Sequence, residues 1–423
     1  MNHGSILISI TRSGERFRTA VVNGRMPGVL DALSRRSDVD LRRMTALLYS
    51  LCPASHLVTL DAARRAAAGM SEDERRAADG GFAERALMLE ALLENIRVLT
   101  MDAGHFMKAA VRTETLRQLG RLRRNAMLVI RTLLAFDAVG GVCVQAEIEK
   151  ASGIIRDTAE ACSPLLYDSV FEMTPDAFLD DLTTPGDLDA WANAATQQPA
   201  GYLMSRTLAE PDGFGLVDCG LLPQIEGEAG MKFADEILHR ISYEPGFDMA
   251  PVWQNEPKLT GAVVRQRRHP LIRAMAARSG VNSALLLAAR LLDTASLCCL
   301  LTGRASKHAV APAPVFSFQA GSRGGAVAMA QTARGLLIHA VGLRQGAQGT
   351  EPFHGVISPT EWQFAPEGPA ARALISALRT LAKTDRRFSD GELADQVRLA
   401  LFPFDACVPL DVQVRTGSVE SED

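Results

Sequence analysis

Residues 404–413 read FDACVPLDVQ, and residues 47–56 read LLYSLCPASH. Each stretch holds one cysteine, Cys407 in the first and Cys52 in the second, and His56 follows Cys52 by four positions. In a helix this spacing places both side chains on one face. Thiolates are soft ligands that suit iron and nickel. A cysteine and a histidine four residues apart are common by chance, so the meaning of each stretch depends on the segments between them.

The composition is that of a chain with a large hydrophobic core. With 423 residues, of which 47% are hydrophobic, the chain can form one large domain or two. The net charge of −4 and the pI near 6.1 give no general attraction to nucleic acid or to an anionic membrane. The N-terminus lacks the pattern of a signal peptide. The seven cysteines are unevenly spaced, which predicts a reducing, cytoplasmic environment rather than a disulfide framework.

Hydrophobic periodicity predicts a hairpin followed by helices in the first part of the chain. Residues 6–10 and 17–22 alternate around a Gly-containing turn, which is typical of a β-hairpin. Helices are expected from Asp38 or Asp40 to Tyr49, and over 55–68, 71–103 and 106–136, with a stop at Gly140-Gly141. Residues 164–260 are rich in Pro, Gly and Asp and predict loops with short elements.

The second part of the chain predicts strands between helices. The apolar run 284–301 contains Arg290 and Asp293, so a helix at 283–302 is expected to be buried rather than to span a membrane. Strands are expected at 315–319, 326–330, 335–341 and 353–357, and helices at 368–383 and 389–401. Helices first and strands later predict an α+β, predominantly helical fold. The acidic, Ser-rich tail, 415–423, is predicted to be disordered.

Several segments, in order, resemble the large subunit of nickel–iron hydrogenases. That family ends in D-P-C-x-x-C-x-x-H and carries R-x-C-G-x-C-x-x-x-H near its N-terminus. Cys407 matches the first cysteine of the C-terminal motif, and Cys52 and His56 match the second cysteine and the histidine of the N-terminal motif. The further matching segments are Gly140-Gly141-Val142, residues 331–335 followed by His339, residues 356–366 and Gly368-Pro369. Residues 145–310 match poorly. The nearest resemblance is to degenerate large-subunit-like accessory proteins of the HupK/HoxV type, which are assembly factors for uptake hydrogenases.

The resemblance implies one large-subunit-like domain over residues 1–414 and roles for five residues. Cys52 corresponds to a thiolate that bridges two metals and Cys407 to a terminal nickel thiolate, which makes both implied metal ligands. His56 is implied as a donor to a metal or thiolate, Arg334 as a guanidinium that faces iron-bound diatomic ligands, and Thr360 as a donor to a cyanide. Ordinary roles remain open, namely small buried cysteines, a core histidine, a salt-bridged arginine and a turn threonine.

The positions that depart from the family pattern lie mostly on its nickel side. Leu30, next to Asp31, stands where the family has a Glu that carries protons. Leu47 replaces an Arg, Tyr49 and Leu410 replace two cysteines, Gln331 replaces a carboxylate, and Gln413 replaces the last histidine. Two thiolates cannot complete a nickel site, but they can hold an iron that brings its own cyanide and carbonyl ligands. The resemblance therefore argues against nickel and predicts that the chain is not an enzyme.

The sequence thus predicts a cytoplasmic scaffold in hydrogenase maturation that carries an iron–cyanide–carbonyl precursor. The implied partners are a small chaperone of the HypC type and the immature hydrogenase large subunit, with neither nucleic acid nor membrane. Three alternatives remain: a metal-free structural relative, a divergent catalytic subunit, and a Cys–His enzyme built on Cys52. Cys298-Cys299 is expected in the core, and the basic runs 117–124 and 265–268 are expected on solvated helix faces or docking faces.

Overall fold

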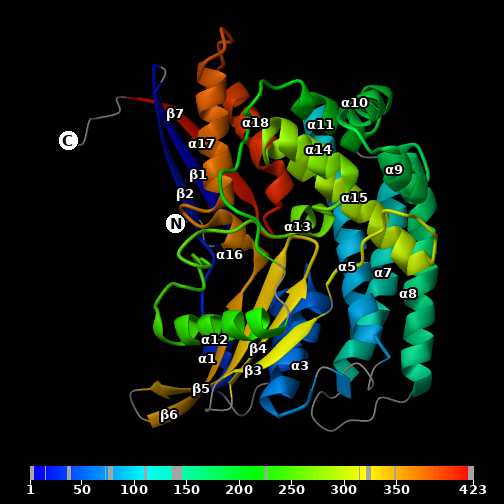
Figure 1. The fold of residues 1–423 in the computed structure, drawn as a ribbon, viewed down its shortest axis with the longest axis vertical. Coiled ribbons are helices and arrows are strands. Elements are labelled where there is room, and N and C mark those ends of the chain that lie inside the picture. The colour runs from blue at the N-terminus through cyan, green and yellow to red at the C-terminus, as the bar shows by residue number, and fades with distance from the viewer. Residues whose placement is uncertain are drawn as a thin grey trace.

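The protein consists of two separate sheets and a large helical layer (Figure 1). The computed structural model describes residues 4–14, 16–35, 40–71, 73–74, 80–108, 112–135, 145–223, 227–313, 315–320, 325–346 and 349–417. The element order confirms the predicted α+β, predominantly helical fold class. The expected stop at Gly140-Gly141 and the matching segment there lie outside the described residues.

One sheet joins the two ends of the chain in the order β2-β1-β7. β1 (Ile6–Ser13) and β2 (Arg16–Asn23) form the predicted hairpin, and the alternating Ile6, Ile8 and Ile10 are fully buried. β7 (Leu410–Thr416) lies parallel to β1 with Ile6 opposite Leu410. This strand was not predicted. It also corrects the start of the expected disordered tail, because Arg415 and Thr416 belong to β7; residues 418–423 lie outside the described part.

The second sheet is an antiparallel meander of the four predicted strands. They are β3 (Phe316–Ala320), β4 (Gly325–Gln331), β5 (Leu336–Gly346) and β6 (Gly349–Ile357). α3 (Pro53–Ala67) and α12 (Gly227–Tyr243) both pack on this sheet, and Figure 1 shows α12 in front of it and α3 behind. Because both faces are covered, β4 is buried along nearly its whole length.

The helical layer surrounds α15 (Ser283–Thr302), which is the predicted buried helix. Among the described residues it is the one helix long and apolar enough to cross a membrane, but 94% of its apolar stretch is buried inside the fold. Its neighbours in the layer are α5 (Phe82–Arg97), α7 (Thr113–Ala135), α8 (Gln145–Leu166), α9 (Pro175–Asp181), α10 (Pro185–Ala194), α11 (Pro199–Leu208), α13 (Ala262–Gln266) and α14 (Pro270–Ser279).

The loops with short elements predicted over 164–260 are present as the helices α9, α10 and α11, of 7, 10 and 10 residues, and only α12, with 17 residues, is longer than expected. Pro175, Pro185 and Pro199 stand in the first turn of α9, α10 and α11, where a missing N–H costs nothing, so these prolines start helices instead of breaking them. The helix expected at 71–103 is not continuous: residues 73–74 are helical, 75–79 lie outside the described part, and α5 begins at Phe82 after Gly81 in the left-handed conformation. α5 continues into a π-helical turn, η1 (Val98–Asp102), and the short α6 (Gly104–Met107).

Shorter helices place the two cysteine stretches beside the second sheet. α1 (Val29–Ser34), which was not predicted, precedes α2 (Leu41–Leu48), whose N-cap is the expected Asp40. α16 (Pro359–Phe364) follows β6, and the predicted α17 (Pro369–Ala382) and α18 (Asp390–Leu401) lead to η3 (Phe402–Phe404). The pairing of β7 with β1 then fixes residues 405–409 between the two sheets.

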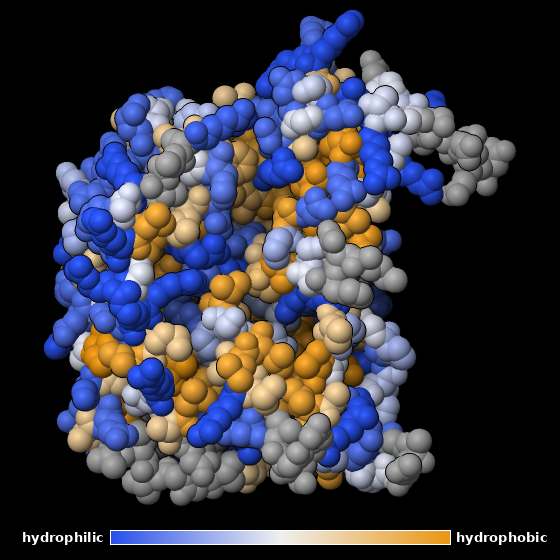
Figure 2. Space-filling model, turned by 180° about the vertical axis from the view of Figure 1, so that it is seen from behind, coloured by the Kyte–Doolittle hydropathy of each residue, from blue (hydrophilic) through white to orange (hydrophobic). Residues whose placement is uncertain are grey.

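Large hydrophobic side chains are also exposed on the surface. Met26 and Leu47 expose 74% and 70% of their area. Figure 2 shows hydrophobic side chains gathered mainly in the lower half of the face seen from behind, next to a hollow with a hydrophilic rim. Grouped exposed apolar residues of this kind are typical of surfaces that contact other proteins.

Candidate functional site

A small enclosed pocket brings together all five residues that the sequence singled out. This thiol pocket is lined by Cys52, His56, Arg334, Thr360 and Cys407, together with Tyr49 and several others, and its cavity volume is about 30 Å³. The two cysteines come from opposite ends of the chain. The sequence predicted that these two cysteines, one from each partly matching motif, lie close together, and both line this pocket.

Thr360 holds Cys407 in place. The Thr360 hydroxyl donates a hydrogen bond to Cys407 Sγ at 3.1 Å, and the Cys407 backbone N–H donates to the same hydroxyl oxygen at 3.3 Å. Thr360 is fixed by the first turn of α16, which Pro359 starts. The hydroxyl thus contacts the thiol itself, whereas the resemblance implied a bond to an iron-bound cyanide.

Cys52 lies on the opposite wall, at the N-terminus of α3. It is the N-cap residue and not part of the helix, so the expected common helix face with His56 is wrong, although both side chains line the pocket. Glu90 of α5 accepts hydrogen bonds from the backbone N–H groups of Ala54 and Ser55 at 2.7 and 2.9 Å. A carboxylate is favourable there because it satisfies the free N–H groups of the first helical turn.

Burial and charge keep the Cys52 thiol protonated. Burial raises the pKa of Cys52 well above its usual value, the negative charge of Glu90 raises it further, and the positive charge of Arg334 offsets part of this. Burial also raises the pKa of Glu90 to about 7, although its hydrogen bonds with Ser55 and Ala54 act in the opposite direction. Cys52 therefore lacks the depressed pKa that a nucleophilic cysteine needs.

Tyr49 and His56 form one side of the thiol pocket. Tyr49, which stands where the family has a cysteine, stacks on the His56 ring with centroids 3.5 Å apart and planes 9° apart. His56 Nδ1 lies 3.0 Å from Nε2 of His339. Burial lowers the pKa of His56 well below its usual value, and the charge of Arg25 lowers it further. His56 is therefore a neutral, fully buried imidazole whose partner is another histidine.

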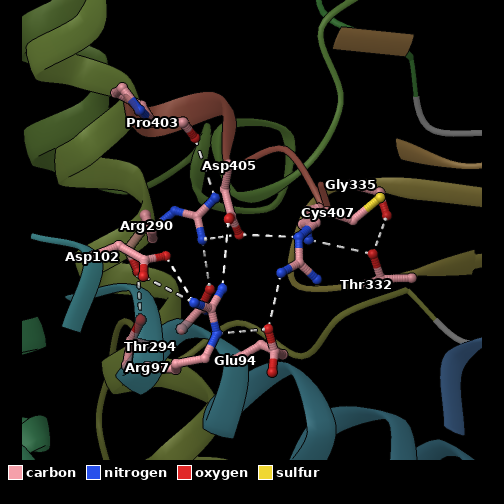
Figure 3. A network of polar contacts seen from close by, with 12 residues as sticks. Glu94, Arg97, Asp102, Arg290, Thr294, Thr332, Gly335, Pro403, Asp405 and Cys407 are labelled. Carbon is pink, nitrogen blue, oxygen red and sulfur yellow. Dashed lines mark hydrogen bonds and ion pairs between the residues drawn. The ribbon is translucent and has the colours of Figure 1, made fainter. Parts of the chain in front are cut away.

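A buried charge network lies next to the Cys407 wall (Figure 3). Arg334 Nη2 lies 2.9 Å from Glu94 Oε2, and its Nε lies 3.3 Å from Asp405 Oδ2. Asp405 also receives a hydrogen bond from Arg290 Nη1 at 3.1 Å, and Glu94 pairs with Arg97 at 3.2 Å. Burial alone would raise the pKa of Asp405, but the charges of Arg334 and Arg290 outweigh it and lower the pKa.

The network carries an excess of positive charge. Its carboxylates are Glu94, Asp102 and Asp405, and its guanidinium groups are Arg97, Arg123, Arg290 and Arg334. Arg334, expected to face diatomic ligands, is at the pocket but also carries two carboxylate partners. Only Arg334 and Glu94 of this network line the thiol pocket, where Arg25 and Glu90 are the other lining Arg and Glu side chains.

Sequence reasoning missed Arg25, Glu90, Glu94 and Glu361. Arg25 Nη1 donates to Glu361 Oε1 at 2.7 Å and to Ser358 Oγ at 2.8 Å. The available signal was the spacing of Glu90 and Glu94, two carboxylates four residues apart in an otherwise apolar helix segment. Arg25 and Glu361 carry no comparable signal, because they are isolated charges in a loop and in a short helix.

The positions that depart from the family pattern lie apart from the thiol pocket, except Tyr49. Gln331 contacts Arg265 at 3.4 Å, and Leu410 and Gln413 are on β7. Asp31 pairs with Arg344 at 2.7 Å in a larger depression, here called the outer cleft, which has a volume of about 340 Å³. The thiol pocket and the outer cleft share Arg25, Tyr49 and Ser358 as lining residues, and Glu361 lines the outer cleft. The three shared side chains therefore form the partition between pocket and cleft.

The donor set fits an iron that brings its own small ligands. In the described residues there is no group of three or more His, Cys, Asp or Glu side chains arranged to hold a metal ion. The pocket instead offers the two thiols of Cys52 and Cys407, a hydroxyl and a guanidinium. Two soft donors suit a metal whose remaining positions are already filled. At about 30 Å³ the cavity has room for roughly two water molecules, so such a unit enters only when lining side chains move apart.

Two other expectations concern residues away from the pocket. Cys298 and Cys299 are fully buried within α15, as predicted. Arg265 in the second basic run is also buried, and its two-pronged contact with Asp293 at 2.7 and 2.6 Å makes it a core ion pair rather than part of a solvated or docking face.

Comparison with known proteins gives hydrogenase accessory proteins as sequence relatives. No protein-family model matches the chain. The chain is 30% identical over 232 residues to the hydrogenase expression/formation protein HoxV of Cupriavidus necator, and the aligned region covers 54% of this chain and 55% of HoxV. The chain is 34% identical over 104 residues to the hydrogenase expression/formation protein HupK of Azotobacter vinelandii, and the aligned region covers 25% of this chain and 26% of HupK. The matches thus span about half of HoxV and a quarter of HupK. The predicted resemblance to this type of protein is confirmed.

Solved hydrogenase structures are similar over nearly the whole chain. A chain of an NAD+-reducing [NiFe]-hydrogenase has a TM-score of 0.49 and 15% identity, and the similarity covers 94% of each chain. A chain of the [NiFeSe] hydrogenase G491S variant from Desulfovibrio vulgaris Hildenborough has a TM-score of 0.48 and 11% identity, covering 95% and 98%. TM-scores below 0.5 do not by themselves establish a common fold.

Proposed function

We propose that this chain is an accessory protein of hydrogenase formation that carries an iron unit with cyanide and carbonyl ligands. The observation that carries the proposal is the thiol pocket, where Cys52 and Cys407 meet from opposite ends of the chain beside Arg334 and Thr360. The similarity to HoxV and HupK, both called hydrogenase expression/formation proteins, supports the assembly role.

In this proposal the two cysteine sulfurs bind the iron and the surrounding donors hold its anionic ligands. A coordinated thiol gives up its proton. The excess positive charge of the network around Arg334 stabilises the anionic complex that results. Thr360 already orients Cys407 through its hydroxyl, so this sulfur is preset before cargo arrives. Tyr49 replaces a further thiol, which leaves two soft donors and favours iron alone over nickel with iron.

The proposed partners are a HypC-type chaperone, which would deliver the unit, and the immature hydrogenase large subunit, which would receive it. Met26 lines the outer cleft and is 74% exposed, and Arg25 and Tyr49 separate that cleft from the thiol pocket. A partner that binds over the cleft therefore contacts the side chains that close the pocket.

A Cys–His enzyme is disfavoured by the same geometry. The His56 imidazole is paired with His339 and stacked on Tyr49, and the pKa of the Cys52 thiol is raised rather than lowered. The remaining alternative is a metal-free structural relative of the hydrogenase large subunit, which would share the fold but bind no iron.

The test is iron content and infrared spectra of protein purified without oxygen. We expect iron and cyanide and carbonyl stretching bands in the wild type, and loss of both in Cys52→Ser and Cys407→Ser, because a Ser oxygen is a harder and far less acidic donor. Cys219→Ser is the matched control, since this half-buried free cysteine lies outside the thiol pocket. Equal iron in all four proteins, or none in the wild type, would leave the metal-free relative as the better reading.

A further inference from the structure

Three buried histidines form a continuous row behind the thiol pocket. His56 Nδ1 on α3 lies 3.0 Å from His339 Nε2 on β5, and His339 Nδ1 lies 2.9 Å from His354 Nε2 on β6. Their exposed fractions are 2%, 0% and 2%. One helix and two neighbouring strands thus bring three imidazoles into a row, with two ring-to-ring contacts at hydrogen-bond distance.

The two ends of the row reach different spaces. His56 lines the thiol pocket, and His354 lines the outer cleft. The backbone N–H of His354 donates to Asp31 Oδ1 at 3.1 Å, which fixes this end next to the cleft. His354 Nδ1 is buried and has no hydrogen-bond partner among the described residues. A buried nitrogen without a hydrogen-bond partner lowers the stability of the fold, so its position at the end of the row suggests that it has a function.

The row is neutral in the folded protein. Burial lowers the pKa of all three rings, to about 4 for His354. The charged groups that act on the ends are Arg25 on His56, and Asp31 and Arg64 on His354. A neutral imidazole has one N–H donor and one bare acceptor nitrogen. The contacts can therefore be satisfied in two ways, with every proton on Nδ1 or every proton on Nε2.

We propose that His56, His339 and His354 are a path along which one proton passes between the thiol pocket and the outer cleft. A proton that binds Nε2 of His56 displaces the Nδ1 proton to Nε2 of His339, which passes its own Nδ1 proton to Nε2 of His354. The Nδ1 proton of His354 then leaves into the cleft once water reaches this buried nitrogen. One N–H bond forms and one breaks on each ring, and the row ends with every proton on Nε2.

The reverse passage resets the row without rotation of any buried ring. The use of the path rests on the carrier function proposed above. Binding of a metal unit releases a proton and its departure takes one up, and the thiol pocket has little contact with solvent. A row that carries one proton out and one proton back matches a cycle of loading and release. It differs from the path of an enzyme that moves protons in one direction only.

The test measures ring N–H exchange with water by NMR on metal-free protein labelled with 15N-histidine, so it does not depend on iron binding. We expect three neutral rings protonated on the same nitrogen, and couplings across both N–H···N contacts. His339→Phe interrupts the row while filling the space of the ring, and should slow exchange at His56 by about a hundredfold. His354→Leu interrupts its outer end and should give the same result. His308→Gln, outside the row, should change nothing.

Two results would overturn the proposal. One is exchange at His56 that is unchanged or faster in both interrupted variants while the backbone amides of α3 remain protected. The other is a His339 ring that holds protons on both nitrogens at neutral pH, since an imidazolium donates in both directions and blocks passage. If the rings behave as expected but no iron binds, the path stands and the carrier function fails. If iron binds but no proton passes along the row, the carrier function stands and the proton path fails.

Discussion

The two walls of the thiol pocket treat their cysteines in opposite ways. On one wall Cys407 receives a hydrogen bond from the Thr360 hydroxyl and lies next to a network with four guanidinium groups. On the other wall the half-buried Cys52 is near Glu90, whose charge raises the thiol pKa. Burial and the Glu90 charge favour the protonated form of Cys52, and the Arg334 charge offsets part of this, whereas the Thr360 hydroxyl fixes the position of Cys407 Sγ.

The difference shows how a site with two equal ligands can be asymmetric before any cargo binds. A sulfur that already has a donor is prepared to act as a ligand. The second sulfur keeps its proton until a metal displaces it.

The largest expected effect comes from the guanidinium that serves both walls. Arg334→Ala leaves Glu94 and Asp405 buried with one cation fewer, and should lower the free energy of unfolding by about 3–5 kcal/mol. Urea unfolding measures the effect, and Arg334→Lys, which keeps a charge, should cost less. A loss below about 1 kcal/mol would mean that the network does not support the pocket.

Next in size is the pH dependence that Glu90 imposes on the Cys52 wall. Its folded pKa of about 7 lies above the usual 4.5, so the folded state binds the proton more tightly than the unfolded state. Stability from this group is therefore full below about pH 4.5 and falls as pH rises to about 7, by up to about 3 kcal/mol. Glu90→Gln should flatten this part of the curve of unfolding free energy against pH. Parallel curves for the two proteins would contradict the assigned pKa.

Glu90→Gln should also make the two cysteines more alike. Without the carboxylate charge the pKa of Cys52 falls, and its alkylation rate at pH 8 should rise about tenfold. Mass spectrometry of the labelled peptides measures Cys52 and Cys407 separately. Cys407 is the internal control, because its donor is Thr360 on the opposite wall. An equal rise at both sites would indicate general loosening of the pocket.

The smallest expected effect is on the Cys407 wall. Thr360→Val keeps the shape of the side chain but removes the hydroxyl that joins Cys407 Sγ and its backbone N–H. The free energy of unfolding should fall by about 1 kcal/mol. Thr360→Ser keeps the hydroxyl and should restore most of the loss. If the serine variant is as weak as the valine variant, the threonine methyl group matters more than the hydrogen bond.

Local pattern was enough for most of the elements that build the site. The hairpin of β1 and β2, the four strands of the second sheet and the helix α15 were predicted from alternation and apolar runs. Prolines left the type of the short elements over 164–260 open, because a proline that starts a helix and one that ends it look alike in sequence. β7 was missed because its pairing with β1 is a contact between residues some 400 positions apart.

The site was partly predictable for a similar reason. Cys52, His56, Arg334, Thr360 and Cys407 belong to short motifs that resemble a known family, and all five line one pocket. Arg25 and Glu361 were missed because each is an ordinary charge in its own segment. Their significance comes from a 2.7 Å ion pair that joins Arg25, which lines both pocket and cleft, to Glu361, which lines the cleft.

The sequence by itself determined which chemical groups are present: two thiols in half-motifs at opposite ends, one guanidinium, one hydroxyl, and too few ligands for a second metal. Only the tertiary structure decided their state. The pKa of Cys52 depends on Glu90 and on burial, the partners of Arg334 are Glu94 and Asp405, and His56 meets His339 instead of Cys52. These properties depend on distances and on the exclusion of water, which act between segments that the chain order does not place together.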